Sequence, residues 1–293
     1  MVAAEQMRGK RAIPPAVLFS WLAIATLLAW LYLPVLVSLL NNWWLDPNYS
    51  HGFLVPAVSA WLIWRQRRSL SRLGAGPNWG GLVAMAMGLI LLMAGQLSHE
   101  FFLQRVSLIF VMWGLVLLYW GFKVARRVLF PFAYLLLMVP LPYVLYDSVA
   151  FPLRLVAASL AGLTFSLLGI PVFVEGNILH LPYVVMNVVD ACSGIRSLIS
   201  LLAAGVLMAY LILPNRLIKV LVVLLVIPVA ILSNALRVVA AGFLAKYWGQ
   251  AAVQGAMHDL VGWLVFLLAF FILAGISWLL RAVWGQGTKA HAV

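Results

Sequence analysis

Long apolar segments separated by short basic clusters dominate this sequence. A helix needs about 17 to 25 apolar residues to cross a bilayer core of about 30 Å. We expect eight spans, near residues 14–40, 50–64, 79–97, 102–121, 128–146, 195–213, 217–244 and 260–280. With 66% hydrophobic and 9% charged residues, the chain has too little polar surface for a soluble fold. The predicted fold class is an all-α polytopic membrane protein, a single integral-membrane domain over residues 1–293.

The basic residues predict how these spans are oriented. Five alternate gaps and tails hold 14 of the 19 Lys and Arg residues but only one of the seven acidic residues, Glu5. The clusters are Arg8, Lys10 and Arg11; Arg65, Arg67, Arg68 and Arg72; Lys123, Arg126 and Arg127; Arg216 and Lys219; and Arg281 and Lys289. By the positive-inside rule these regions, including the tails at 1–13 and 282–293, are cytoplasmic. The net charge of +12 therefore indicates topology, and we expect no nucleic-acid partner.

Two segments before the later spans have a different pattern. Residues 147–170 are apolar but contain Pro152 and Arg154, and no basic cluster follows them. We interpret this segment as interfacial or re-entrant, because a further span would place the later basic clusters outside. Residues 171–189 alternate in hydrophobicity around a Glu-Gly-Asn turn at 175–177, which predicts a short β-hairpin on the outer face. An ordered loop that caps the bundle is the alternative.

Three reactive side chains lie one membrane thickness from a basic cluster. At 1.5 Å per helical residue, Cys192, Arg237 and His258 lie about 36, 27 and 34 Å of helix from the nearest cytoplasmic marker. Three separate spans would therefore bring them to the outer face. A thiolate, a guanidinium and an imidazole suit acyl transfer at a peptide bond, as nucleophile, charge stabiliser and acid–base group.

Each of these residues also has a purely structural interpretation. Cys192 is the only cysteine, so it forms no internal disulfide, but an isolated cysteine often packs as a small apolar residue. His258 and Asp259 are consistent with a helix start, where an acidic side chain is favourable. Arg237 is harder to explain structurally, because a guanidinium inside an apolar run is costly in a bilayer.

The order of several motifs resembles that of the exosortase/archaeosortase family. The motifs are Cys-Ser-Gly-Ile-Arg-Ser-Leu at 192–198, Asn-Ala-Leu-Arg at 234–237, and His258 upstream of Gly262. The proline-containing segment at 130–142 and the Ser-His-Gly-Phe-Leu-Val-Pro segment at 50–56 resemble further parts of that family. The similarity covers roughly residues 45–275.

This resemblance implies a membrane-embedded cysteine peptidase or transpeptidase with Cys192 as nucleophile, Arg237 as charge stabiliser and His258 as acid and base. Its substrates would be exported proteins with a C-terminal sorting signal, consisting of a Pro-Glu-Pro-like motif, a membrane helix and a basic tail. Cleavage would proceed through a thioester at the outer, periplasmic face of the bacterial inner membrane. Either water or an acceptor amine would resolve the acyl-enzyme.

Four further side chains are candidates for substrate binding: Arg196, His51, Asn234 and Asp259. A cation such as Arg196, four residues after the cysteine, favours the thiolate form. His51 is alternatively a structural contact of an outer loop, and His180 in the predicted hairpin is a rival base. We expect no cofactor and no catalytic metal, because His99 and Glu100 lack the second histidine of a metal-binding helix motif.

Two other function classes remain open. A non-catalytic transporter or assembly protein for an envelope polymer would use Arg196 and Arg237 to bind an anionic group. A membrane acyltransferase would depend on His258 and Asp259. Both alternatives leave Cys192 dispensable. The expected partners are the lipid bilayer, the exported proteins and a separate periplasmic accessory protein. The accessory protein is expected because some members of the family resemble fusions with an additional soluble domain.

Overall fold

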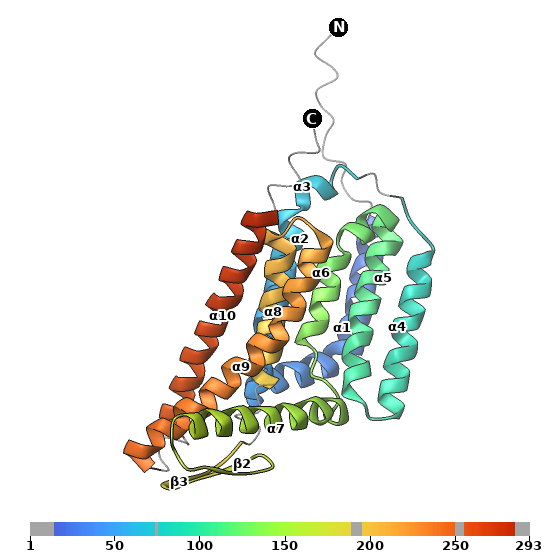
Figure 1. The fold of residues 1–293 in the computed structure, drawn as a ribbon. Helices are drawn as coiled ribbons and strands as arrows, with labels where there is room; N and C mark the ends of the chain where they lie inside the picture. The colour runs from blue at the N-terminus through green and yellow to red at the C-terminus, as the bar shows by residue number, and fades with distance from the viewer. Residues whose placement is uncertain (1–14, 74–75, 189–194, 250–254, 285–293) are drawn as a thin grey trace.

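A computed structural model describes residues 15–73, 76–188, 195–249 and 255–284 of this protein (Figure 1). The α-helices are Pro15–Leu45 (α1), Leu54–Arg65 (α2), Arg67–Leu70 (α3), Gly80–Leu97 (α4), Phe101–Arg127 (α5), Leu129–Tyr134 (α6), Tyr143–Leu167 (α7), Ile195–Ile212 (α8), Arg216–Trp248 (α9) and Ala256–Trp284 (α10). Two short 3₁₀ helices, Pro47–Phe53 (η1) and Leu135–Met138 (η2), precede α2 and follow α6.

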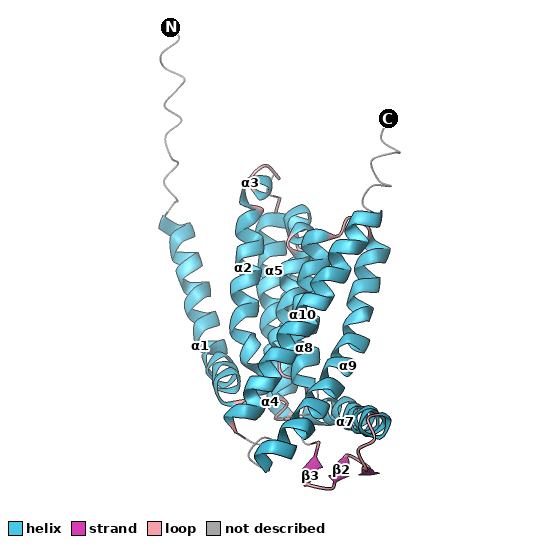
Figure 2. Ribbon diagram, turned by 60° about the vertical axis from the view of Figure 1, so that its left-hand side comes forward, coloured by secondary structure: helices cyan, strands magenta, loops and turns pink. Residues whose placement is uncertain are grey.

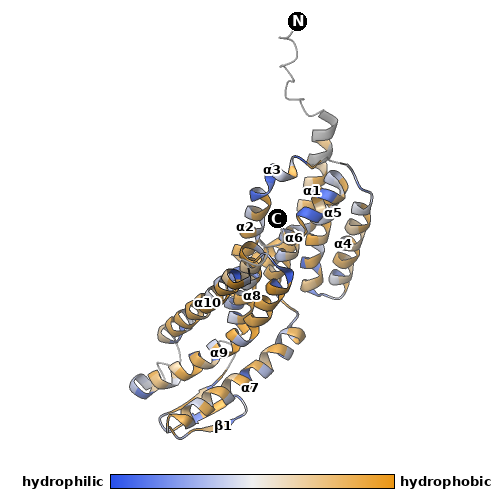
Figure 3. Ribbon diagram, turned by 45° about the horizontal axis from the view of Figure 1, so that its top comes forward, coloured by the Kyte–Doolittle hydropathy of each residue, from blue (hydrophilic) through white to orange (hydrophobic). Residues whose placement is uncertain are grey.

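The predicted class, an all-α polytopic membrane protein, is confirmed. Within the described ranges, seven helices are long and apolar enough to cross a membrane. The bundle is apolar on its outside as well as inside: Leu22, Leu27 and Trp30 of α1 are 59%, 64% and 78% exposed. Figure 3 shows the same apolar character along the other long helices. Such a surface is unfavourable in water and favourable in lipid.

The neighbouring helices α9 and α10 are both longer than the thickness of a bilayer core. α9 has 33 residues and α10 has 29, or about 50 and 44 Å at 1.5 Å per residue, against a core of about 30 Å. Both run at a slant to the vertical in Figure 1 and pack against each other and against α8. Their ends therefore extend beyond the hydrocarbon or the helices tilt within it.

Two of the expected spans differ from the prediction. The segment 128–146 does not form one helix: α6 and η2 end at Met138, and a non-helical Pro-Leu-Pro segment, 140–142, separates them from α7. Proline lacks an amide donor and restricts the residue before it, so this segment ends a helix. The expected span at 50–64 consists of η1 followed by α2, which has only 12 residues.

α7 lies across one end of the bundle instead of along it (Figure 1). The view in Figure 2, turned by 60°, sees the same helix almost end-on. By length and composition α7 is able to cross a membrane, but its orientation favours the interfacial interpretation of residues 147–170. The guanidinium of Arg154 donates to Asp147 on the same helix at 2.9 Å, which offsets its charge.

The predicted hairpin is present and is extended by a third strand. Strands Phe173–Glu175 (β1), Ile178–Leu181 (β2) and Val184–Asn187 (β3) form an antiparallel sheet in sequence order. Gly176 has φ 61° and is the first of the two residues between β1 and β2, the arrangement of a type II′ turn. Buried side chains of β2 and β3 pack with Phe165 of α7 and Val238 of α9. The sheet is therefore fixed to the α7 end of the bundle.

Charge separates between the two ends of the bundle. The described members of the basic clusters lie at or near α3, the end of α5, the start of α9 and the end of α10, which share one end in Figure 1. The acidic residues that the structure describes lie toward the α7 end: Asp46, Glu100, Asp147, Glu175 and Asp259. This separation agrees with the predicted orientation, while the assignment of the basic end to the cytoplasm stays a prediction.

Candidate active site

Arg237 of α9 and His258 of α10 meet in the interior of the protein. The Arg237 Nη2 lies 2.9 Å from the His258 Nε2, and the two residues are 9% and 5% exposed. A guanidinium has only donors, so the Nε2 accepts this hydrogen bond. The imidazole is therefore neutral in this geometry and carries its proton on Nδ1. Two of the three predicted catalytic side chains are thus in direct contact.

Gly262 allows this contact. It lies one helical turn after His258 on α10, and a Cβ added there would be 2.8 Å from the Arg237 Cζ and 2.8 Å from its Nη2. The planar guanidinium consequently packs against the bare backbone of α10. The sequence indicated Gly262 only as part of a motif, and the structure gives it a steric role.

A cavity of about 430 Å³ lies beside this pair, with walls from four elements. Its lining comprises Pro47 and Ser50 of η1, Arg196, Ser197 and Ser200 of α8, Arg237 of α9, and Asp259, Gly262, Trp263 and Phe266 of α10. Two guanidinium groups, one carboxylate and two aromatic rings therefore face a space large enough for part of a peptide. The chemical character of this cavity suits a substrate on which negative charge develops.

The structure brings some, but not all, of the predicted binding residues to this cavity. Arg196 and Asp259 line it, and the Arg196 Nε donates to the Pro47 carbonyl at 3.0 Å, which joins α8 to η1. Asn234 is buried one turn before Arg237 on α9 but is not in the lining. Cys192 lies outside the described residues.

The predicted rival base, His180, belongs to a different part of the protein. Its Nε2 lies 3.5 Å from the Glu175 Oε2 within the sheet, and the residue does not line the cavity. Among the residues that the structure describes, no three His, Cys, Asp or Glu side chains gather in a way that could hold a metal ion.

Several lining residues were missed by the sequence analysis. Ser197 and Ser200 interrupt the apolar surface of α8 next to Arg196, and polar positions in a membrane helix are a usable signal. Ser50 belonged to the 50–56 segment but was not predicted as a site residue. Pro47 and Trp263 carried no comparable signal, because their role depends on how η1 and α10 pack in three dimensions.

His51 connects η1 to the helices behind the cavity. Its Nε2 lies 3.2 Å from the Leu137 carbonyl oxygen, and its Nδ1 lies 3.5 Å from the Ser200 Oγ. A carbonyl only accepts, so the Nε2 carries the proton and the Nδ1 is the acceptor. Burial lowers the pKa of His51 below its ordinary value, although hydrogen bonds to the Leu137 and Asn48 backbone oppose the shift. The structural interpretation of His51 is thereby favoured over direct substrate binding.

His51 is expected to make stability depend on pH. Because the pKa of His51 is lowered in the folded state, the unfolded state binds the proton more strongly. The contribution of neutral His51 to stability is therefore complete above about pH 6.5, the pKa of an unperturbed histidine. This contribution is lost as the pH falls through the folded pKa. Thermal unfolding of the purified protein at pH 8 and pH 5 would measure this loss. His51→Gln should reduce the pH dependence, and identical pH slopes for the two proteins would contradict this assignment.

Comparison with known families agrees with the arrangement of the site. A model of the transmembrane exosortase family matches residues 43–275. No curated protein and no solved structure matches the chain. The matched region includes every residue that lines the cavity, as well as Cys192 and His258. The chain therefore belongs to the transmembrane exosortases, a family of membrane proteases and transpeptidases.

Proposed function

We propose that this protein is a cysteine transpeptidase or protease that cleaves the C-terminal sorting signals of exported proteins at the outer face of the inner membrane. The observation that carries this proposal is the buried contact between Arg237 and His258 beside a cavity that Arg196 also lines. Cys192, four residues before Arg196, is the nucleophile in this proposal.

Chain connectivity supports a position for Cys192 near the cavity. The residue is three positions before Ile195, which is 1% exposed at the start of α8, and four after Val188, which is 1% exposed at the end of the sheet. A fully extended chain spans at most about 3.6 Å per residue, so Cys192 and Ile195 are at most about 11 Å apart. Two buried anchors thus limit how far the thiol can be from the site.

In the proposed first step, the Arg237 guanidinium turns away from the Nε2 of His258, the thiol proton moves to this nitrogen, and the thiolate attacks the substrate carbonyl carbon. Protonation leaves this nitrogen unable to accept from Arg237, and the two cations then repel each other. The guanidinium therefore stays turned toward the cavity, where negative charge is developing on the carbonyl oxygen. Arg237 thereby stabilises the oxyanion after it has held the imidazole neutral.

Collapse of this intermediate breaks the carbon–nitrogen bond, and the imidazolium gives its proton to the leaving amine. A thioester on Cys192 remains. Attack by water yields a carboxylic acid, whereas attack by an acceptor amine yields a new amide; both routes return the proton to the thiol sulfur. The same acid–base group thus serves both halves of the reaction.

The charge distribution supports a sorting signal as substrate. With the basic end in the cytoplasm, the cavity lies at the outer interface. A substrate with a membrane helix and a cytoplasmic basic tail would present the segment before its helix at this depth. Its Pro-Glu-Pro-like motif would then reach the cavity without the helix leaving the bilayer.

Co-expression with a reporter that carries such a signal tests this function. Processing should be lost in Cys192→Ala and Cys192→Ser, and the wild type should form a thiol-sensitive adduct with the reporter. Because Cys192 is the only cysteine, the adduct has a single site of attachment. Equal amounts of each variant in the membrane fraction serve as the control. Undiminished processing in Cys192→Ala would overturn the mechanism and favour transport or histidine-based acyl transfer.

A further inference from the structure

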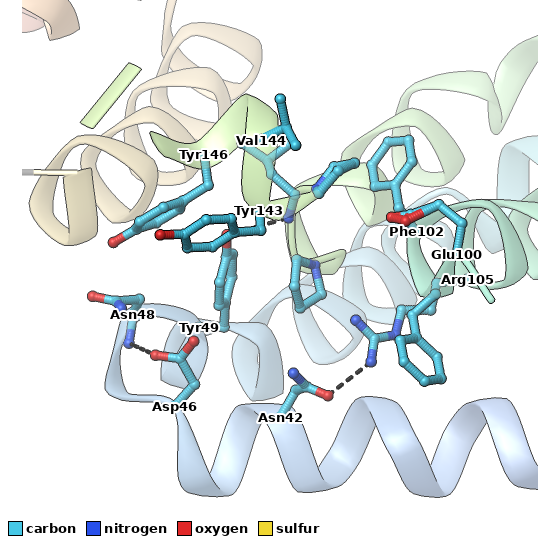
Figure 4. A pocket seen from close by; sticks show the side chains of 14 residues that line it. Asn42, Asp46, Asn48, Tyr49, Glu100, Phe102, Arg105, Tyr143, Val144 and Tyr146 are labelled. Atoms are coloured by element: carbon cyan, nitrogen blue, oxygen red, sulfur yellow. Dashed lines mark hydrogen bonds between the residues drawn. The ribbon is translucent and has the colours of Figure 1, made fainter. Parts of the chain in front are cut away.

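A second cavity, of about 580 Å³, opens at the same end of the bundle (Figure 4). The short helix η1 separates it from the candidate active site: Pro47 and Ser50 line the first cavity, whereas Asn48 and Tyr49 line the second. An occupant of the second cavity would therefore be a neighbour of a substrate bound in the first. No part of the catalytic mechanism uses this cavity.

The second cavity contains a buried arginine. Arg105 of α5 is 4% exposed, and its Nη2 donates to the Asn42 Oδ1 at 2.7 Å (Figure 4) and to the Ser38 Oγ at 2.9 Å. The ring of Phe101 lies 5.5 Å from the Arg105 Cζ. Among the described residues, the Nε has no hydrogen-bond partner, and no carboxylate lies within ion-pair distance of the guanidinium. The two groups that accept hydrogen bonds from this guanidinium, the Ser38 hydroxyl and the Asn42 side-chain amide, are both neutral.

No described carboxylate reaches Arg105 at ion-pair distance, although Glu100 is near enough to interact with its charge. A ligand carboxylate in direct contact would offset the cost of burying this cation. Asp46 and Glu100 also line the cavity, and the Asp46 carboxylate accepts from the Asn48 amide at 2.9 Å. Two carboxylates near one guanidinium disfavour a doubly charged ligand such as phosphate, because like charges repel at this range. Asp46, Glu100 and Arg105 together give the lining a formal charge of −1, so a ligand with one carboxylate in contact with Arg105 is favoured over a doubly charged ligand.

The remaining walls are suited to a peptide. Tyr49, Tyr143 and Tyr146 line the cavity together with Pro140 and Pro142, and the Leu141 amide donates to the Tyr49 hydroxyl at 3.2 Å. Aromatic side chains of this kind bind extended, proline-containing segments through ring contacts. In Figure 4 the rings of Tyr49, Tyr143 and Tyr146 stand close together above η1, away from Arg105. One end of the cavity thus offers aromatic surface, and the other offers Arg105 with Glu100 nearby (Figure 4).

We propose that this second cavity is a substrate subsite in which Arg105 binds a carboxylate side chain of the peptide while its scissile bond lies in the first cavity. The identity of the peptide rests on the proposed function. The Arg105 guanidinium is the donor for the carboxylate, and Ser38 and Asn42 hold its Nη2 in place. Arg105 is then a specificity residue for an acidic side chain in the sorting signal.

Peptide affinity in the absence of turnover tests the subsite. Purified Cys192→Ala protein in lipid nanodiscs would be titrated with acetyl-Pro-Glu-Pro-amide and with the same peptide carrying glutamine. The glutamate peptide should bind about tenfold or more tightly, because a charge-assisted hydrogen bond is lost in the glutamine peptide. Adding Arg105→Gln should abolish this preference, whereas Arg105→Lys should retain part of it.

Arg154→Gln is the matched control, because Arg154 lies at the same end of the bundle but is paired with Asp147. This variant should keep the full preference for glutamate, and thermal unfolding of each variant would verify that it is folded. Equal affinity for the two peptides, or a preference that survives Arg105→Gln, would overturn the subsite. Competition by inorganic phosphate at lower concentration than acetate would overturn the single-carboxylate assignment. Failure of the proposed function would appear separately, as reporter processing that is independent of Cys192.

Discussion

Arg237→Lys is expected to lower the rate of reporter processing by about two orders of magnitude, comparable with removal of one donor to an oxyanion. A lysine ammonium keeps the charge but is a point donor on a flexible chain, whereas the guanidinium is planar and holds several donors in fixed directions. Lysine therefore cannot reproduce the 2.9 Å contact with His258 and also present a fixed donor to the cavity. Initial rates of signal cleavage in membranes with matched protein levels would measure the effect.

The same substitution at Arg216 provides the control, because Arg216 is exposed at the opposite end of the same helix. Arg216→Lys should process the reporter at the wild-type rate. A rate within twofold of wild type for Arg237→Lys would show that charge alone is sufficient at this position, and the requirement for a planar donor would be withdrawn.

Gly262→Ala should reduce processing by roughly 100-fold, the order of loss expected when a catalytic group is misplaced by about 1 Å. The new Cβ would lie 2.8 Å from the Arg237 Cζ, so the guanidinium must shift and lengthen its contact with His258. Alanine favours a helix over glycine by about 1 kcal/mol, so the loss should not come from a weakened α10. Cleavage rates and thermal unfolding of the same preparations would separate the two effects.

Gly275→Ala is the matched control on the same helix, because a Cβ at Gly275 meets no atom within 4 Å. This variant should keep the wild-type rate and be at least as stable. Wild-type processing by Gly262→Ala would mean that the guanidinium tolerates displacement, and the close packing on α10 would then have no catalytic importance.

The class of fold could be predicted because a bilayer constrains a sequence strongly. Apolar length and the positions of basic clusters were sufficient for the bundle and for its two differently charged ends. The break at Pro140 and Pro142 was missed because a sum of hydropathy ignores the missing amide donors of proline. The third strand was missed because Pro182 and Tyr183, which separate β2 from β3, lack the glycine or asparagine that marked the first turn.

The contact between Arg237 and His258 could be predicted in part, because both residues lie one membrane thickness from a basic cluster and a buried cation needs an explanation. Sequence spacing gives depth but not the rotation of a helix about its axis. The walls formed by Ser50 and Trp263 were therefore not foreseen. Arg105 carries the same signal as Arg237, an isolated cation in an apolar segment, but its place near a helix end made it resemble an ordinary interfacial charge.

The excess length of α9 and α10 has a consequence for the lipid environment. Arg237 lies on α9 and His258 on α10, which are about 50 and 44 Å long and pack against each other. A helix longer than the hydrocarbon core responds to a thicker or thinner bilayer by changing its tilt. A change in the tilt of one helix relative to the other would alter the separation of the guanidinium and the imidazole. Acyl-chain length is therefore expected to influence the distance between the Arg237 guanidinium and the His258 imidazole.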